Sequence, residues 1–186
     1  MKKSLYIFAI IMLCCAFTIS AQQKIPKNYQ KKYMLEGLQP WIGEQFIDKE
    51  QINNIDWREY QYWLKNIFGS ESEEYKASIP DEKILYQQLP EEVAKVYAKS
   101  PAYANYPVLG ISVEQAQTYC RWRTNRVAEQ MLCKMKFMEY NRDQSRENYF
   151  SLEKFGEPEG MKFLRFDLPS EANETRYGFR CVAVWK

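Results

Sequence analysis

One continuous stretch, residues 106–123, constrains the fold more than any other part of this chain. It starts extended, because a proline disfavours the helical conformation in the residue before it, and Gly110 then provides a flexible joint. Ser112 and Gln115 have the spacing of a capping box, in which each side chain pairs with the backbone N–H of the other residue. Apolar positions recur beyond them at helical spacing: Val113, Ala116, Tyr119, Cys120 and Val127. The stretch predicts an extended segment leading into a capped helix that places Cys120 in the core.

The first 21 residues have the composition of a secretion signal. Two lysines precede an almost wholly apolar run from Leu5 to Phe17, which is short for a membrane span, and a small residue at position 21 predicts cleavage before Gln22. The alternatives are acylation of Cys14 or Cys15, as in a lipoprotein, and a retained anchor. The sequence therefore predicts an exported protein of the periplasm or outer membrane, associated with the membrane only if it is lipidated.

Charge and histidine content exclude several function classes for the predicted mature chain, residues 22–186. Removing two of the 26 basic residues with the signal leaves 24, against 24 acidic residues, so the mature chain has no general attraction to nucleic acid. The sequence contains no histidine. Ser-His-Asp and Cys-His catalysis and histidine-ligated metal sites are therefore excluded, and we expect neither a cofactor nor a metal.

Three cysteines remain after the predicted cleavage, in an oxidising compartment. Cys120 and Cys133 are 13 positions apart on one predicted helix, which separates them by roughly 20 Å at about 1.5 Å per residue, beyond disulfide reach. Cys181 must then be a partner in any bridge. The pair Cys120–Cys181 is favoured because both residues lie in well-defined apolar elements, which leaves Cys133 as a free thiol.

The remaining sequence predicts a polar arm followed by a single domain over residues 41–186. Helices are expected over 57–68 with Asp56 as N-cap, over 91–99, and from 113 to about 140. Strands are expected within 41–47, over 163–166 and near the end, within 177–185. Residues 22–40 are predicted to form the loose arm, 70–83 a surface loop, and 141–160 a loop with little fixed structure.

Four segments occur in an informative order: residues 46–60, residues 106–122, residues 165–174 (RFDLPSEANE) and residues 178–181 (GFRC). The first is similar to an opening strand, turn and helix, the third to an LPTEAEWE motif, and the fourth to a closing strand. Together they resemble the formylglycine-generating-enzyme-like family, also called the sulfatase-modifying-factor domain. The detail around residues 100–127 looks closest to gliding-motility lipoproteins of the Bacteroidetes, which belong to or work with the type IX secretion machinery.

The resemblance implies a fold and departs from the family at one place. It implies a shortened, compact α+β domain of the C-type-lectin-like kind, with Cys120 and Cys181 as the family's disulfide. In the enzymes, a long segment between the LPTEAEWE and GFRC motifs holds the copper-binding catalytic cysteine pair. Here Tyr177 follows Glu174 almost directly, and Cys133 matches neither catalytic cysteine. The resemblance therefore implies a domain without catalytic residues.

We accordingly expect a non-catalytic interaction domain of the cell envelope, accessory to gliding motility or type IX secretion, with envelope protein partners. A homo-oligomer is a further expectation, because a shortened sheet leaves edges to cover. The aromatic residues that we single out as a candidate contact surface are Tyr103, Tyr106, Trp122 and Trp185.

Two alternative functions stay open. The first is a degenerate formylglycine-generating-type oxidase that uses Cys133 as a redox thiol, although a cysteine packed beside several methionines is more simply unreactive. The second is a lectin-like binder of carbohydrate or cell-wall material. The sequence shows no cluster of acidic residues typical of a calcium site for such a binder, since Asp167, Glu171 and Glu174 more simply belong to a solvated loop.

Overall fold

The computed structural model describes residues 35–170 and 175–186, which form a mixed α+β domain. Its longest element is the helix α7, Val113–Lys134. The predicted signal, with Cys14 and Cys15, most of the predicted arm, and Glu171 and Glu174 lie outside the described residues.

Four short strands form one antiparallel sheet in the order β1-β2-β4-β3. Their bounds are β1 Leu38–Pro40, β2 Phe46–Asp48, β3 Leu164–Asp167 and β4 Val182–Trp185. The last strand lies in the middle of the sheet, where it pairs Ala183 with both Phe46 of β2 and Phe166 of β3. The sheet therefore joins segments from both ends of the domain.

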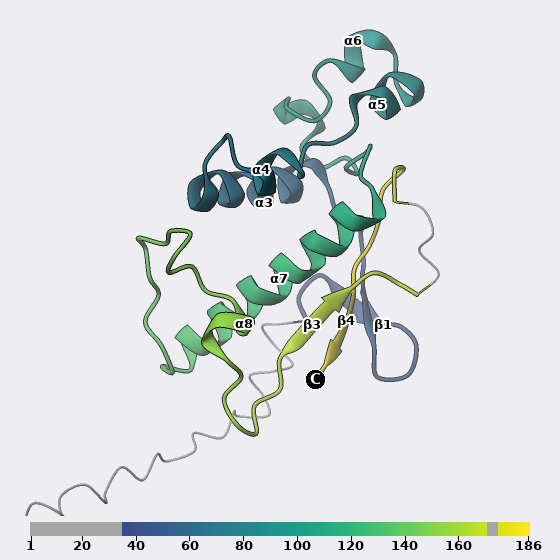
Figure 1. Cartoon of the computed structure of the whole chain (residues 1–186). Helices are drawn as coiled ribbons and strands as arrows, with labels where there is room; N and C mark the ends of the chain where they lie inside the picture. The colour runs from purple at the N-terminus through teal and green to yellow at the C-terminus, as the bar shows by residue number, and fades with distance from the viewer. Residues whose placement is uncertain (1–34, 171–174) are drawn as a thin grey trace, which may run out of the picture.

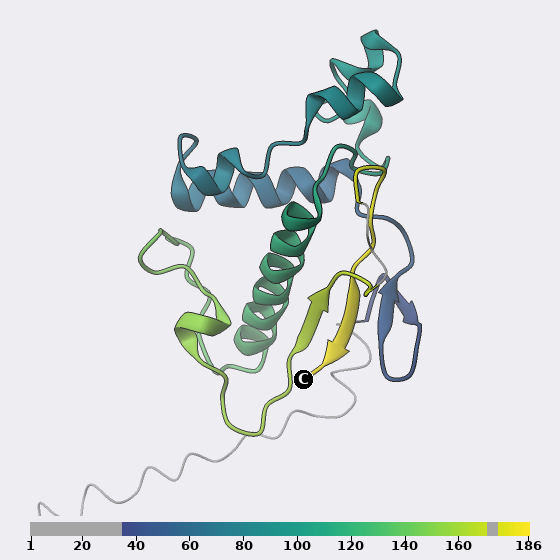
Figure 2. The ribbon, with the colours of Figure 1, turned by 45° about the vertical axis from the view of Figure 1, so that its right-hand side comes forward.

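Helix α7 lies along one side of the sheet, and α3, Asn54–Phe68, crosses near the beginning of α7 (Figures 1 and 2). The main core fills the space between α3, α7 and the sheet, around Trp57, Tyr119 and Phe179. A second cluster lies at the far end of α7, where Met131 and Leu132 pack against Phe150 and neighbouring residues. A third, smaller cluster holds the outlying helices α5, Glu82–Gln88, and α6, Glu91–Ala94.

The beginning of α7 confirms the capping box. The Ser112 hydroxyl accepts the Gln115 N–H at 3.2 Å, and Oε1 of Gln115 accepts the Ser112 N–H at 2.8 Å. Gly110 is a fixed joint, which corrects the expectation of a flexible one. Its backbone bonds to Arg176 O and Asp81 N, both at 2.8 Å, and at its φ of +74° an added Cβ would lie 2.7 Å from Asp81 O.

Other element boundaries differ from the predictions. The first helix begins three residues before Trp57, because Asn53 is the N-cap and Asp56 is its partner in a second capping box. Helix α7 ends at Lys134 rather than near 140, since the chain turns through Met135 and Lys136, the latter with a φ of 59°. The helix expected over 91–99 is only α6, and turns follow it.

Three segments expected to be irregular contain regular structure. Residues 38–40, assigned to the arm, form β1. Of the strand expected within 41–47, only the last two residues are in a strand, β2, because residues 41–45 form the turn that joins β1 to β2. Residues 70–83 contain α4, Glu73–Lys76, and the first two residues of α5. Residues 141–160 contain α8, Leu152–Phe155, and contribute Phe150 and Leu152 to the second core cluster.

Candidate functional site

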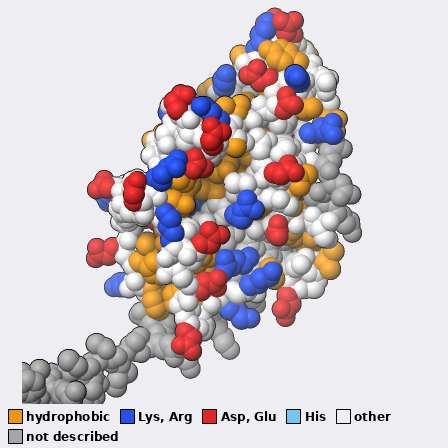
Figure 3. All heavy atoms as spheres, in the orientation of Figure 1, with side chains coloured by type: hydrophobic (Ala, Val, Ile, Leu, Met, Phe, Trp, Pro, Cys, Tyr) orange, Lys and Arg blue, Asp and Glu red, His pale blue; other side chains and the backbone are white. Residues whose placement is uncertain are grey.

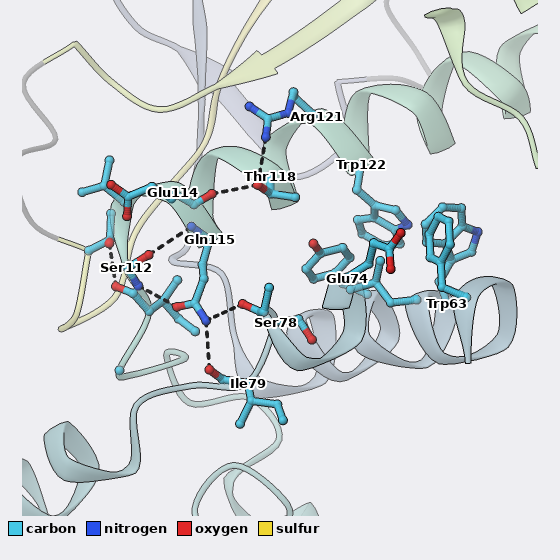
Figure 4. Close-up of a pocket in the computed structure, with 18 of the residues that line it drawn as sticks. Trp63, Glu74, Ser78, Ile79, Ser112, Glu114, Gln115, Thr118, Arg121 and Trp122 are labelled. Atoms are coloured by element: carbon cyan, nitrogen blue, oxygen red, sulfur yellow. Dashed lines mark hydrogen bonds between the residues drawn. The ribbon is translucent and has the colours of Figure 1, made fainter. Parts of the chain in front are cut away.

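An open groove of about 1020 Å³ lies between α3 and α7. The connector from α4 to α5 closes one end, and the segment around Tyr149–Glu153 closes the other. Figure 3 shows hydrophobic side chains gathered on this face, with acidic and basic side chains around them. In Figure 4, Ser112 and Gln115 lie at one end of the groove, while Trp63 and Trp122 lie at the other.

Aromatic rings from three segments form much of the groove wall. Trp63 of α3 contacts Trp122 of α7 at 6.4 Å between ring centroids, Phe68 at 5.9 Å and Tyr149 at 5.6 Å. Tyr60 contacts the Trp122 ring at 5.2 Å, and burial raises the pKa of Tyr60 to about 12, so its hydroxyl stays neutral. Aromatic walls of this kind supply large contact areas that lose little side-chain entropy on binding.

Cations cover one face of several rings. The Arg126 guanidinium lies 4.7 Å from the centre of the Trp63 ring, Lys154 Nζ lies 3.6 Å from Tyr149, and the Arg146 guanidinium lies 5.1 Å from Phe68. These cation–π contacts fix the rings. They also reduce the ring surface that a flat ligand could stack on.

The opposite end of the groove is polar, and Gln115 organises it. Besides its part in the capping box, its side-chain amide donates to Ala77 O at 2.8 Å and to Ile79 O at 2.9 Å (Figure 4). One side chain therefore holds the beginning of α7 and the connector after α4 together. The Thr118 hydroxyl, one turn further on, bonds to Glu114 O and accepts from Arg121.

Acidic groups outnumber basic groups in the groove lining. The carboxylates are Glu74, Asp81, Glu114 and Glu153, and the guanidinium groups are Arg121 and Arg176. Glu74 forms an exposed ion pair with Arg146 at 3.2 Å. Within the described ranges, neither Glu114 nor Glu153 lies within ion-pair distance of a lysine or arginine. The rim therefore has unneutralised negative charge.

Arg126 anchors the segment that closes one end of the groove. It pairs with Glu129 at 2.7 Å and donates to Phe150 O, and its neighbour Asn125 accepts the Leu152 N–H at 3.0 Å. Burial lowers the pKa of Arg126 and raises the pKa of Glu129, although each partially offsets the shift of the other. Two buried donors, Arg126 Nε and Trp122 Nε1, have no hydrogen-bond partner among the described residues.

Cys120, Cys133 and Cys181 lie outside the groove lining. Cys120 and Cys181 are buried on the sheet side of α7, with their Sγ atoms 2.9 Å apart and both thiols free. The contact with Cys181, together with burial, raises the pKa of Cys120. The two residues are thus neighbours, as the pairing requires, and the disulfide itself stays a prediction. Cys133 is half-buried, and burial raises the pKa of its thiol, which keeps it protonated at neutral pH.

The four aromatic residues predicted as a contact surface occupy three places. Tyr103 and Tyr106 contact each other at 5.7 Å beside Tyr97, next to the third core cluster. Trp122 lines the groove, and Trp185 packs against the other two clusters. Among the described residues, no ring contact joins the tyrosine pair to either tryptophan.

The sequence analysis did not single out most of the groove residues. It did not name Trp63, Phe68 and Tyr149 of the aromatic wall or Thr118 of the polar end, and it assigned Gln115 to the capping box alone. A signal for α3 existed, because the apolar positions of this helix cover more than the single stripe that one core requires. Tyr149 had no such signal, since it lies in a charged segment without periodicity.

Comparisons with protein-family models, with curated proteins and with solved structures found no match to this chain. In the part of the chain that the structure describes, no helix is both long and apolar enough to cross a membrane. The same residues contain no group of three or more Asp, Glu or Cys side chains that could hold a metal ion.

Proposed function

We propose that this chain is an exported, non-catalytic interaction domain of the cell envelope that uses the α3–α7 groove to bind a protein partner. The observation that supports this most is the anatomy of the groove, which has a fixed aromatic wall inside a charged rim. Protein interfaces commonly place aromatic anchors at their centre and polar groups around them.

The proposal also includes the fold, the family and the location of the protein in the cell envelope. We propose a shortened C-type-lectin-like domain of the formylglycine-generating-enzyme-like family, accessory to gliding motility or type IX secretion. The support is the order of the four sequence segments, to which the structure adds the proximity of Cys120 and Cys181. Mass spectrometry of the protein from its native envelope tests the setting: an N-terminus at Gln22 supports export with cleavage, and a lipid on Cys14 or Cys15 would instead indicate a lipoprotein.

Capture from detergent-solubilised envelopes tests the groove. Thr118→Arg places a long cation in the groove, and Gln117→Arg makes a similar change at the next, exposed position of α7, which does not line it. We expect one or more envelope proteins to bind the parent chain and Gln117→Arg equally, and to bind Thr118→Arg at least fivefold less. Equal capture by all three forms would contradict the proposal.

The lectin-like alternative predicts a different result in the same experiment. Ring faces that would stack on a sugar are partly covered by Arg126, Lys154 and Arg146, which favours a protein partner over a saccharide. Digesting the envelope proteins before capture separates the two. Groove-dependent binding that survives digestion would favour the carbohydrate alternative, and binding that is lost supports a protein partner.

The oxidase alternative depends on the reactivity of Cys133. Because burial raises the pKa of this thiol, we expect iodoacetamide to label it slowly at pH 7.5 and faster as the pH increases toward 9. Peptide mass spectrometry with glutathione as a reference thiol measures the rate. Labelling of Cys133 faster than glutathione at pH 7.5 would favour the redox alternative over the proposed function.

A further inference from the structure

The groove has a chemistry that a basic, aromatic peptide would complement. Its wall presents Trp63, Trp122 and Tyr149, and its lining has four carboxylates against two guanidinium groups. Two of these carboxylates, Glu114 and Glu153, are exposed and form no ion pair with a lysine or arginine among residues 35–170 and 175–186. An occupant with positive charge and apolar or aromatic side chains would therefore gain contacts with both the wall and the rim.

The same chain contains a segment of this composition immediately before the described residues. Residues 22–34 (QQKIPKNYQKKYM) include four lysines and no acidic residue, together with Ile25, Tyr29, Tyr33 and Met34. No stretch of 13 residues that begins after residue 23 combines four or more basic residues with the absence of acidic ones. Charge and side-chain type thus both match the groove.

The segment is also long enough. Thirteen residues span up to about 44 Å when extended, whereas α7, the longest element, is about 33 Å long. Leu35, where the described chain begins, packs against the same core cluster as Tyr60 and Leu64, which line the groove. A link of this length covers the distance across one domain.

We propose that residues 22–34 of the chain occupy its own α3–α7 groove, and that an envelope partner binds by displacing them. Lysines of the segment pair with Glu114 and Glu153, and its apolar side chains contact the wall around Trp63 and Trp122. The inference rests on the proposed function in taking the groove as the contact surface. It adds an intramolecular competitor, which lowers the apparent affinity for the partner by the fraction of open chains.

Limited digestion of the full mature chain with endoproteinase Lys-C tests this occupancy without any partner. The enzyme cuts after Lys24, Lys27, Lys31 and Lys32, and cleavage of a reversibly docked segment follows the population of the open form. We expect these cuts to be about tenfold slower in the parent chain and in Gln117→Arg than in Thr118→Arg. The urea midpoints of the three proteins should agree, which shows that the domain itself is unchanged.

Charge reversal in the segment provides a second test. The double variant Lys27→Glu/Lys31→Glu should expose Lys24 and Lys32 to cleavage as Thr118→Arg does. A matched control, Lys49→Glu/Lys162→Glu, makes the same charge change at two exposed positions outside the groove lining and should keep the parent's slow cleavage.

Two outcomes would overturn the inference. One is equal cleavage of residues 22–34 in the parent chain and in Thr118→Arg. The other is protection that disappears on dilution, because it would place the segment in the groove of a second copy. If envelope capture depends on the groove but residues 22–34 are not protected, this inference is rejected and the proposed function is retained. If residues 22–34 are protected but no envelope protein is captured through the groove, the proposed function is rejected and the occupancy of the groove is retained.

Discussion

The two sides of helix α7 differ in how their polar groups and aromatic rings are packed. On the sheet side, buried polar groups are paired: Asp48 accepts from Arg123 at 2.7 Å and from the Cys181 N–H at 2.9 Å, and Thr124 links α7 to β3. On the groove side, the rings of Trp63 and Trp122 border open space, and two buried donors have no hydrogen-bond partner in the part of the chain that the structure describes. The comparison indicates that the sheet side supplies stability and that the groove side is built for contact.

The largest difference should come from the buried ion pair on the sheet side. Asp48→Ala removes the acceptor shared by Arg123 and the Cys181 N–H, and leaves the mostly buried guanidinium without its partner. We expect the free energy of unfolding, measured with urea, to fall by about 3–5 kcal/mol. Glu74→Ala breaks the exposed pair with Arg146 on the groove side and should cost less than about 1 kcal/mol. Similar losses would contradict the division between the two sides.

Two threonines on α7 permit a more closely matched comparison. Thr124 is buried, donates to Cys120 O at 3.0 Å and accepts the Phe166 N–H at 2.9 Å. Thr124→Val keeps the shape and leaves that N–H without an acceptor, so we expect a loss of about 1–3 kcal/mol. Thr118→Val, at an exposed position on the groove side, should change the unfolding free energy by less than about 0.5 kcal/mol. Equal losses of unfolding free energy in the two variants would show that the side of the helix does not determine how much stability is lost.

Trp57 in the core and Trp122 beside the groove should differ in how much stability the domain loses when each is replaced by phenylalanine. Trp57 Nε1 donates to Ser78 O at 2.9 Å in the core, whereas Trp122 Nε1 is buried and has no hydrogen-bond partner within residues 35–170 and 175–186. Trp57→Phe should therefore destabilise the domain by about 1–2 kcal/mol, and Trp122→Phe should be neutral or stabilising by up to about 1 kcal/mol. Urea unfolding of both variants measures this. A marked loss of unfolding free energy in Trp122→Phe would contradict this expectation.

The smallest expected effect is the pH dependence of the buried pair at the end of the groove. Burial raises the pKa of Glu129, so its contribution to stability is complete below the pKa of the unfolded chain and is lost as the pH rises through the folded value. Relative to Glu129→Gln, the parent should become less stable between pH 4 and pH 7. Asp56, whose pKa burial also raises, is present in both proteins and cancels. If the difference in unfolding free energy between the parent and Glu129→Gln does not change with pH, the raised pKa of Glu129 is contradicted.

The sequence predicted best where one short stretch contains all the determinants of a structure. The beginning of α7 follows from Ser112 and Gln115, which are three positions apart, and was confirmed. The beginning of α3 was misplaced because two suitable N-caps, Asn53 and Asp56, lie close together and only their mutual bonding distinguishes them. Local signals thus suffice for a helix start except where they compete.

Features that depend on distant contacts were missed. Residues 141–160 look like a loop because their charged composition has no periodicity, yet Arg126 and Asn125 of α7 hold this segment in place. The groove likewise combines rings from α3, α7 and Tyr149 with a connector held by Gln115. No single stretch of sequence contains these relationships, and only the folded arrangement reveals them.

The double role of Gln115 has a consequence for how the domain opens. Its side chain bonds to Ser112 in its own helix turn and to Ala77 and Ile79, 38 and 36 positions earlier. Fraying of the helix end and detachment of the connector therefore cannot be independent fluctuations. Amide hydrogens in both segments should exchange with solvent as one cooperative unit, and Gln115→Glu, which keeps the cap acceptor and removes the amide donors, should divide that unit in two.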